Sequence, residues 1–99
     1  MRIIARSTLR EFWEKYADAE KPLHDWYDLV KAADWKTPQD VKNTFNDASI
    51  IGDNRIVFNI KGNDYRLVVH FLYEFGTLRI KWIGTHRDYD RINAEKVGR

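Results

Sequence analysis

The fold is decided by residues 55–83, which read RIVFNIKGNDYRLVVHFLYEFGTLRIKWI. Apolar and polar side chains alternate over residues 55–61, again over 66–73, and most clearly over 78–83. This two-residue period is typical of strands with one buried face. Turn-forming residues separate the runs at 61–64 and 74–77. We therefore predict an antiparallel meander of three strands.

The residues before the meander have the three- and four-residue spacing of helices. Residues 2–5 form a short apolar run that predicts a first strand. A helix should follow, opened by a capping box from Thr8 to Glu11. A second should open at Pro22, the favoured first helical position, and a third at 37–40. The apolar stripes of the first two helices are Leu9, Phe12, Trp13 and Tyr16, then Leu23, Trp26, Tyr27, Val30 and Ala33.

A last capping box, from Thr85 to Asp88, predicts a short C-terminal helix near residues 87–94. Helices grouped before strands indicate an α+β fold, in which N-terminal helices pack on one face of a mainly antiparallel sheet. The chain has 99 residues, of which 43% are hydrophobic. That size and composition predict one domain, residues 1–99.

Composition excludes several classes of protein. The chain contains no cysteine, which excludes a disulfide scaffold, a cysteine zinc site and a thiol nucleophile. No apolar run approaches the roughly 20 residues of a membrane span, and residues 1–6 lack the apolar region of a signal peptide. We therefore expect a cytoplasmic protein without membrane contact. Residues 1–50 carry 8 Lys and Arg against 9 Asp and Glu, whereas residues 51–99 carry 9 against 6, so a polyanion site is expected in the second half.

The predicted strands have two different faces. One face is wholly apolar and should lie under the helices: Ile56, Phe58, Ile60, Leu67, Val69, Phe71, Leu78, Ile80 and Trp82. The polar residues of the other face include no acid: Arg55, Asn59, Lys61, Arg66, His70, Arg79 and Lys81. This second face is either a solvated surface whose charges deter edge pairing or an anion-binding surface. We favour the second interpretation, because charges of both signs are the rule on a neutral surface.

His86 is the histidine whose surroundings suggest chemistry. It lies between a predicted strand and a predicted helix, in the run Gly-Thr-His-Arg-Asp-Tyr-Asp at residues 84–90. The free amides and positive dipole of a helix start suit a phosphate, although Thr85 and Asp88 could merely cap the helix while His86 faces solvent. His24 is expected at the surface and His70 in packing. Three scattered histidines without a zinc-binding motif predict no metal and no cofactor.

Three segments together resemble the HigB-type toxins, RelE-superfamily members of bacterial type II toxin–antitoxin systems. They are residues 57–67, residues 84–90 and residues 35–41 with the amphipathic helix before them. The resemblance implies a RelE-like microbial ribonuclease fold. It also implies an endoribonuclease that cuts messenger RNA in the ribosomal A site, and neutralisation by a HigA-type helix-turn-helix antitoxin.

The same resemblance suggests roles for individual residues. Metal-free RNA cleavage uses the 2′-hydroxyl as nucleophile and needs proton transfer and a cation at the phosphate. Arg66, within the family's Tyr-Arg-Leu motif, is expected to bind the phosphate, with Lys61 as an electrostatic helper. His86 and Tyr89 are the proton-transfer candidates, since histidine has a reference pKa of about 6.5. The residues expected to bind RNA are Arg55, Asn59, Arg79, Lys81 and Arg87.

Two other functions remain open at this point. The same cationic face would serve a non-catalytic module that binds RNA or the ribosome. The chain could also be a degenerate toxin that acts through its antitoxin complex. A histidine and a tyrosine at 86 and 89 favour the enzyme, because binding alone has little need of them.

Overall fold

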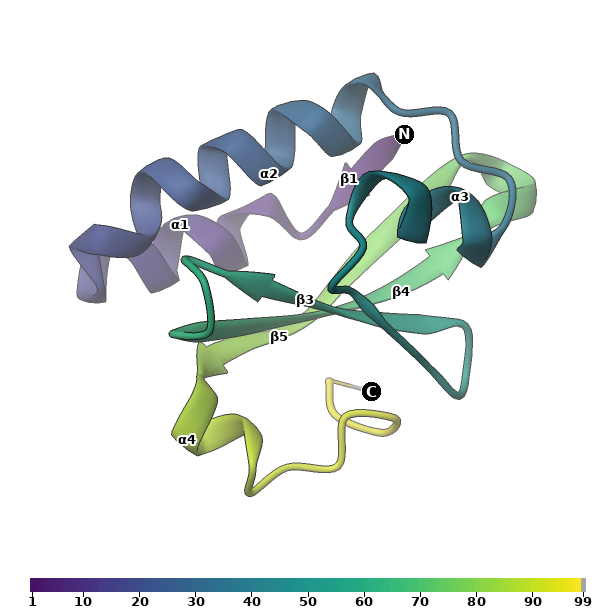
Figure 1. Ribbon diagram of the computed structural model, residues 1–99. Coiled ribbons are helices and arrows are strands. Elements are labelled where there is room, and N and C mark those ends of the chain that lie inside the picture. The colour runs from purple at the N-terminus through teal and green to yellow at the C-terminus, as the bar shows by residue number, and fades with distance from the viewer. Residues whose placement is uncertain (99) are drawn as a thin grey trace.

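The computed structural model describes residues 1–98, which form strands, α-helices and two short 3₁₀ helices (Figure 1). In chain order the elements are β1 (Arg2–Ile4), α1 (Arg6–Lys15), η1 (Ala17–Ala19), α2 (Glu20–Ala32), α3 (Pro38–Thr44), β2 (Ser49–Ile51), β3 (Arg55–Ile60), β4 (Tyr65–Leu72), η2 (Tyr73–Phe75), β5 (Thr77–Thr85) and α4 (His86–Tyr89). The order confirms the α+β class.

The strands form one sheet in the order β1-β5-β4-β3-β2. β3, β4 and β5 are antiparallel neighbours, which confirms the predicted meander. β2 extends the sheet beside β3 and was not predicted, because three residues are too few to show alternation. β1 runs parallel to β5 but pairs only with Thr77–Arg79, so among residues 1–98 no strand lies outside the rest of β5.

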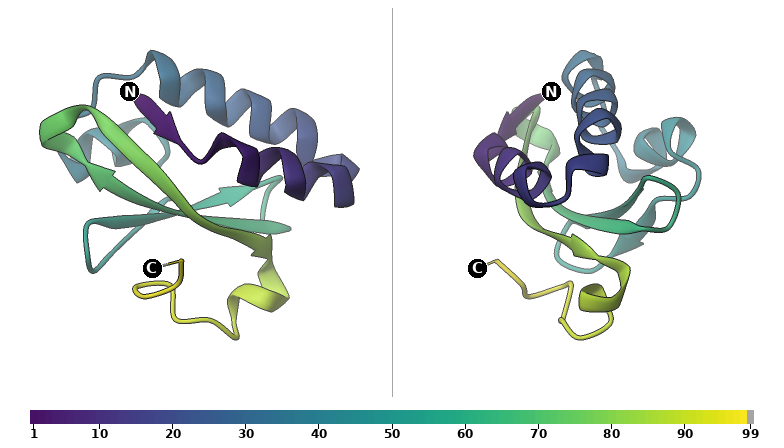
Figure 2. Two further views of the ribbon diagram at one scale, coloured as in Figure 1. Left: turned by 180° about the vertical axis from the view of Figure 1, so that it is seen from behind. Right: turned by 90° about the vertical axis from the view of Figure 1, so that its left-hand side faces the viewer.

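The three N-terminal helices lie on one side of the sheet, while α4 and the residues after it lie on the other (Figures 1 and 2). The core is the layer between the sheet and α1, α2 and α3. Phe58 of β3 is at its centre, in edge-to-face contact with Trp26 at 5.4 Å and Phe45 at 5.2 Å between ring centroids. Each such contact stabilises the fold by about 0.5–1.5 kcal/mol beyond the area it buries.

Two of the predicted helix starts are wrong. α1 begins at Arg6, and Thr8 lies inside its first turn, where its N–H donates to the Ala5 carbonyl at 3.0 Å. The chain must turn directly after β1, and Ala5 does so with a left-handed φ of 73°. α2 begins at Glu20, which places Pro22 in its first turn, where a missing N–H costs little.

The predicted start of α3 at residues 37–40 is confirmed, and the structure shows a complete capping box there. Thr37 Oγ1 accepts from the Asp40 N–H at 3.3 Å, and the Asp40 carboxylate accepts from the Thr37 N–H at 3.1 Å. At α4 the Thr85 hydroxyl accepts from the Asp88 N–H at 3.1 Å, so the predicted cap residue is right. The helix itself ends at Tyr89, earlier than predicted.

A β-bulge at Lys81 changes the faces of β5. Val69 is opposite Ile80 and Val68 is opposite Trp82, so Lys81 is an extra residue without a partner. Because strand faces alternate, the extra residue moves Trp82 to the face away from the helices, opposite Val68. Ile83 packs against the core in its place. The prediction that Trp82 lies under the helices is therefore wrong.

Candidate functional site

The candidate site lies where β4 begins, β5 ends and α4 begins. Arg66 of β4 is flanked by Asn59 of β3 and Gly84 of β5, its partners in the sheet register. Its Nη1 donates to the Asn63 carbonyl at 3.0 Å. Its guanidinium lies 5.9 Å from the centroid of the Tyr89 ring, in a cation–π contact. The half-buried Arg66 side chain is thus held between the β3–β4 turn and α4.

The Tyr89 ring also contacts Trp82, with 6.1 Å between the two ring centroids. Gly84 makes room for this indole: a Cβ at Gly84 would stand 2.4 Å from the Trp82 ring. Sequence reasoning missed both residues. The glycine directly after the alternating run 78–83 was the available signal, since glycine inside a strand often marks a close approach.

His86 is the first residue of α4, one helical turn before Tyr89, so the two side chains are neighbours on the helix surface. Its backbone N–H donates to the Asp64 carbonyl at 3.0 Å, which ties α4 to the β3–β4 turn. Its side chain is half exposed, with Nδ1 3.9 Å from Asp90 Oδ1. The structure therefore brings together three predicted residues, Arg66, His86 and Tyr89.

Lys61 is engaged elsewhere. Its Nζ lies 3.0 Å from Asp18 Oδ2 and 3.1 Å from Asp64 Oδ2. The Tyr65 hydroxyl also donates to Asp18. Hydrogen bonds from Tyr65 and Lys61 lower the pKa of Asp18, those to Asp18 and Asp64 raise the pKa of Lys61, and the bond to Asp18 raises the pKa of Tyr65 to about 12. Lys61 thus remains a cation whose charge is already shared with two carboxylates.

Arg55 is buried, with 1% of its surface exposed. Its Nη1 donates to the carbonyls of Ala94 at 2.9 Å and Val97 at 2.6 Å, and its Nε lies 3.4 Å from Asp53 Oδ2. These carbonyls belong to the C-terminal segment, residues 90–98, which crosses the face of the sheet opposite the helices (Figure 2). Arg55 therefore anchors this segment and offers no surface to a ligand.

The remaining predicted RNA-binding residues are dispersed. Asn59 donates to the side chain of Asp47 at 3.2 Å. Lys81, at the bulge, has its Nζ 3.4 Å from the Gly98 carbonyl. Arg79 and Arg87 are exposed, and neither forms an ion pair with an acid among residues 1–98. Two free cations thus lie on the same side of the sheet as Arg66, one on β5 and one on α4.

His70 and His24 behave as expected of packing and surface residues. His70 is half buried opposite Arg55 and Arg79, and burial lowers its pKa. The partly exposed His24 ring lies tilted against that of Trp13, with 4.6 Å between ring centroids. Neither lies beside Arg66.

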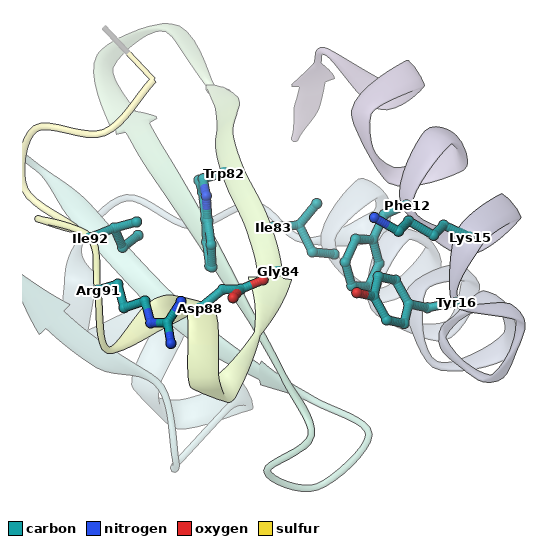
Figure 3. A pocket seen from close by; sticks show the side chains of 9 residues that line it. All are labelled: Phe12, Lys15, Tyr16, Trp82, Ile83, Gly84, Asp88, Arg91 and Ile92. Carbon is teal, nitrogen blue, oxygen red and sulfur yellow. The ribbon is translucent and has the colours of Figure 1, made fainter.

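A pocket of about 420 Å³ opens beside the site, at the outer edge of β5 (Figure 3). Side chains of α1 form one wall, and Trp82 with residues from α4 onward forms the other. Its floor is the β5 edge itself. The lining residues are Phe12, Lys15, Tyr16, Trp82, Ile83, Gly84, Asp88, Arg91 and Ile92.

Across residues 1–98, no three His, Asp or Glu side chains gather closely enough to hold a metal ion. Among the same residues, no helix is long and apolar enough to cross a membrane. Arg66, His86 and Tyr89 together offer a cation for an anionic group and side chains able to donate or accept protons.

Comparison with known proteins identifies the family. The model of a family described as HigB toxin, the RelE-like toxic component of a toxin–antitoxin system, matches residues 19–92. A protein of Escherichia coli O6:H1 named mRNA interferase HigB is 26% identical over 94 residues, covering 93% of this chain and 91% of the relative. Its namesake in Shigella flexneri is 27% identical over 96 residues, covering 95% and 92%. The family match includes every residue of the Arg66, His86 and Tyr89 cluster, and the chain belongs to the HigB family of RelE-like toxins.

Proposed function

We propose that this chain is a ribosome-dependent endoribonuclease that cleaves messenger RNA in the A site and thereby inhibits translation and growth. One observation carries the proposal. At the junction of β4, β5 and α4, Arg66 contacts Tyr89, and His86 lies one helical turn before Tyr89 on α4. Relatives named mRNA interferase HigB support the proposal. Because its substrate is translated messenger RNA, the toxin would act in the cytoplasm, with a HigA-type helix-turn-helix antitoxin as its partner.

The chemistry follows from the reactive groups of RNA. The 2′-oxygen attacks the adjacent phosphorus, the bond to the 5′-oxygen breaks, and the products are a 2′,3′-cyclic phosphate and a 5′-hydroxyl. One proton leaves the 2′-hydroxyl and one reaches the 5′-oxygen, so no metal or co-reactant is needed. Arg66 would bind the phosphate and stabilise its additional negative charge.

His86 and Tyr89 would carry the protons. Both residues belong to α4, the Tyr89 ring lies against the Arg66 guanidinium, and each side chain can donate or accept a hydrogen bond. Tyr89 has a second possible role, since its ring, between Arg66 and Trp82, offers an aromatic surface to a base. Arg79 and Arg87 would contact the RNA backbone, with Lys81 and Asn59 at the margin. Arg55 is buried and is not among the residues that would contact RNA. Lys61, which is paired with Asp18, would act only through the electrostatic attraction of its positive charge for the phosphate.

The open position of the cluster favours a requirement for the ribosome. The His86 side chain is half exposed, whereas its backbone N–H is held by the Asp64 carbonyl. A reaction that depends on in-line geometry gains several orders of magnitude when the substrate is held in place. The ribosome would supply that alignment.

A reconstituted translation system tests the proposal. Primer extension on a reporter messenger RNA should show discrete cuts that require ribosomes. Arg66→Ala, His86→Ala and Tyr89→Phe should each reduce cleavage by about 10²-fold or more. Arg10→Ala, which removes an exposed cation from α1 on the opposite side of the sheet, is the control and should cleave normally.

Other results would replace the proposal. Ribosome binding without cleavage would indicate a non-catalytic binding module. If Arg66→Ala lost cleavage while His86→Ala kept full activity, His86 would have no role in proton transfer and would serve only as the first residue of α4. Equal cleavage of naked and translated RNA would remove the ribosome from the mechanism.

A further inference from the structure

The outer edge of β5 is unpaired beside the candidate site. β1 covers β5 only at Thr77–Arg79, so no described strand lies outside the stretch from Ile80 to Thr85. Such an edge is a template for another strand, and proteins usually shield it with charge, a bulge or a covering segment. Here the bulge at Lys81 lies toward one end, and Trp82, Ile83 and Gly84 line the pocket in Figure 3.

The register identifies which backbone groups face outward. In an antiparallel ladder, pairs that exchange hydrogen bonds alternate with pairs that do not. The His86 N–H donates to the Asp64 carbonyl, so this pair is of the bonded type. From this pair, the alternation along the register makes Gly84 a residue whose backbone is hydrogen-bonded to β4. The backbone groups of Thr85 and Ile83 are not hydrogen-bonded to β4. The N–H and C=O groups of Ile83 and Thr85 therefore point away from β4, toward the open edge.

The pocket surrounding this edge has apolar walls on both faces of the sheet. Phe12 and Tyr16 of α1, stacked at 4.6 Å, lie on one face, and Trp82 and Ile92 lie on the other (Figure 3). A strand laid beside β5 would direct its side chains alternately to these two faces. Apolar side chains would meet an apolar wall on each side.

Charge at the rim of the pocket indicates the chemistry of the incoming segment. Lys15 projects from α1 and Arg91 from the residues after α4, on opposite walls (Figure 3). Neither forms an ion pair with an acid among the described residues, and Asp88 is the one acid in the lining. The excess of cations favours an occupant with acidic side chains flanking its apolar ones.

We infer that the outer edge of β5, at Ile83 and Thr85, receives an extended acidic segment of the antitoxin as an additional strand. The inference rests on the proposed function in that it takes the antitoxin as the partner. Main-chain hydrogen bonds give such a strand its affinity, and the alternating walls of the pocket give it specificity. Since Trp82 and Gly84 belong both to the pocket and to the surroundings of Tyr89 and Arg66, the added strand would also restrict access to the candidate site.

Amide hydrogen exchange tests this arrangement without any substitution. The probe is the purified cognate antitoxin of the proposed function, a HigA-type helix-turn-helix protein, added to the isolated toxin. In the free protein the amides of Trp82 and Gly84 should already be protected by β4. On complex formation those of Ile83 and Thr85 should slow about a hundredfold or more, while the Trp82 and Gly84 amides change little. Ile83 and Thr85 amides that remain as exposed as in the free toxin would overturn the inference.

Charge reversal gives an independent readout. Lys15→Glu combined with Arg91→Glu should weaken binding of the antitoxin about tenfold or more. The matched control, Lys21→Glu with Lys31→Glu, reverses two exposed cations of α2 and should leave the affinity unchanged.

The outcomes distinguish the two proposals. Reduced messenger RNA cleavage by the Lys15→Glu, Arg91→Glu variant with full antitoxin affinity would assign the pocket to RNA and overturn the inference alone. Failure of the HigA-type antitoxin to bind the toxin at all would overturn the inference together with the antitoxin part of the proposed function.

Discussion

Replacing Arg55 by methionine should cost this small domain a large part of its stability. Arg55 Nη1 donates to the carbonyls of Ala94 and Val97, at 2.9 and 2.6 Å, from a side chain that is 1% exposed. Hydrogen bonds with a charged partner contribute about 1.5–3 kcal/mol each, so the gross loss is roughly 3–6 kcal/mol. Methionine restores part of the lost stability, because its side chain fills the space of Arg55 without burying a charge. We expect a net loss of about 2–4 kcal/mol.

Urea unfolding followed by tryptophan fluorescence measures this loss. For a domain of this size, the melting temperature should fall by roughly 10–20 °C. Arg79→Met is the matched control, because Arg79 lies on the same face, opposite the same His70, and is exposed. It should change the unfolding free energy by less than about 0.5 kcal/mol. A loss in Arg55→Met as small as that of the control would refute the role of Arg55 as the anchor of the C-terminal segment.

Two further substitutions test the surroundings of the site. Gly84→Ala places a Cβ 2.4 Å from the Trp82 ring, so it should displace the indole, destabilise the fold by about 1–3 kcal/mol and shift the tryptophan emission; an unchanged spectrum and melting temperature would contradict the close approach. Asp18→Asn removes the carboxylate that bonds to Lys61 and Tyr65. In the wild type this carboxylate has a lowered pKa, and it raises the pKa values of Lys61 and Tyr65. The lowered pKa stabilises the fold above the ordinary value of 3.8, and the raised pKa values stabilise it below the ordinary 10.0 of tyrosine. Wild type should therefore melt above Asp18→Asn at neutral pH, and the difference should shrink as the pH falls below about 4 or rises toward 12. A difference that is independent of pH would contradict the ion pair.

The alternation of residues 55–83 was sufficient to predict three strands and their antiparallel pairing, because side-chain period and turn residues are local signals. It could not show the extra residue at Lys81. A bulge leaves the composition of the strand unchanged and is visible only in the partner's register, so the face of Trp82 was predicted incorrectly.

The candidate site shows the same division between local and long-range information. The sequence motif placed Arg66, His86 and Tyr89 on neighbouring elements, and the structure brings them together. Arg55 is an arginine on the same strand face as Arg66, so its sequence position suggested a cation that binds ligand. In the structure it is buried by residues about 40 positions later in the chain. Burial by a segment without regular structure has no local sequence signal, which is why the C-terminal segment was predicted as a longer helix.

The role of Arg66 in metal-free RNA cleavage is tested by the rate and products of messenger RNA cleavage on the ribosome by wild type, Arg66→Ala and Arg10→Ala. We expect fragments that end in a 2′,3′-cyclic phosphate and begin with a 5′-hydroxyl. We also expect a rate about 10²–10³-fold lower for Arg66→Ala and a normal rate for Arg10→Ala. Fragments that begin with a 5′-phosphate, or an Arg66→Ala protein as fast as wild type, would contradict this role of Arg66.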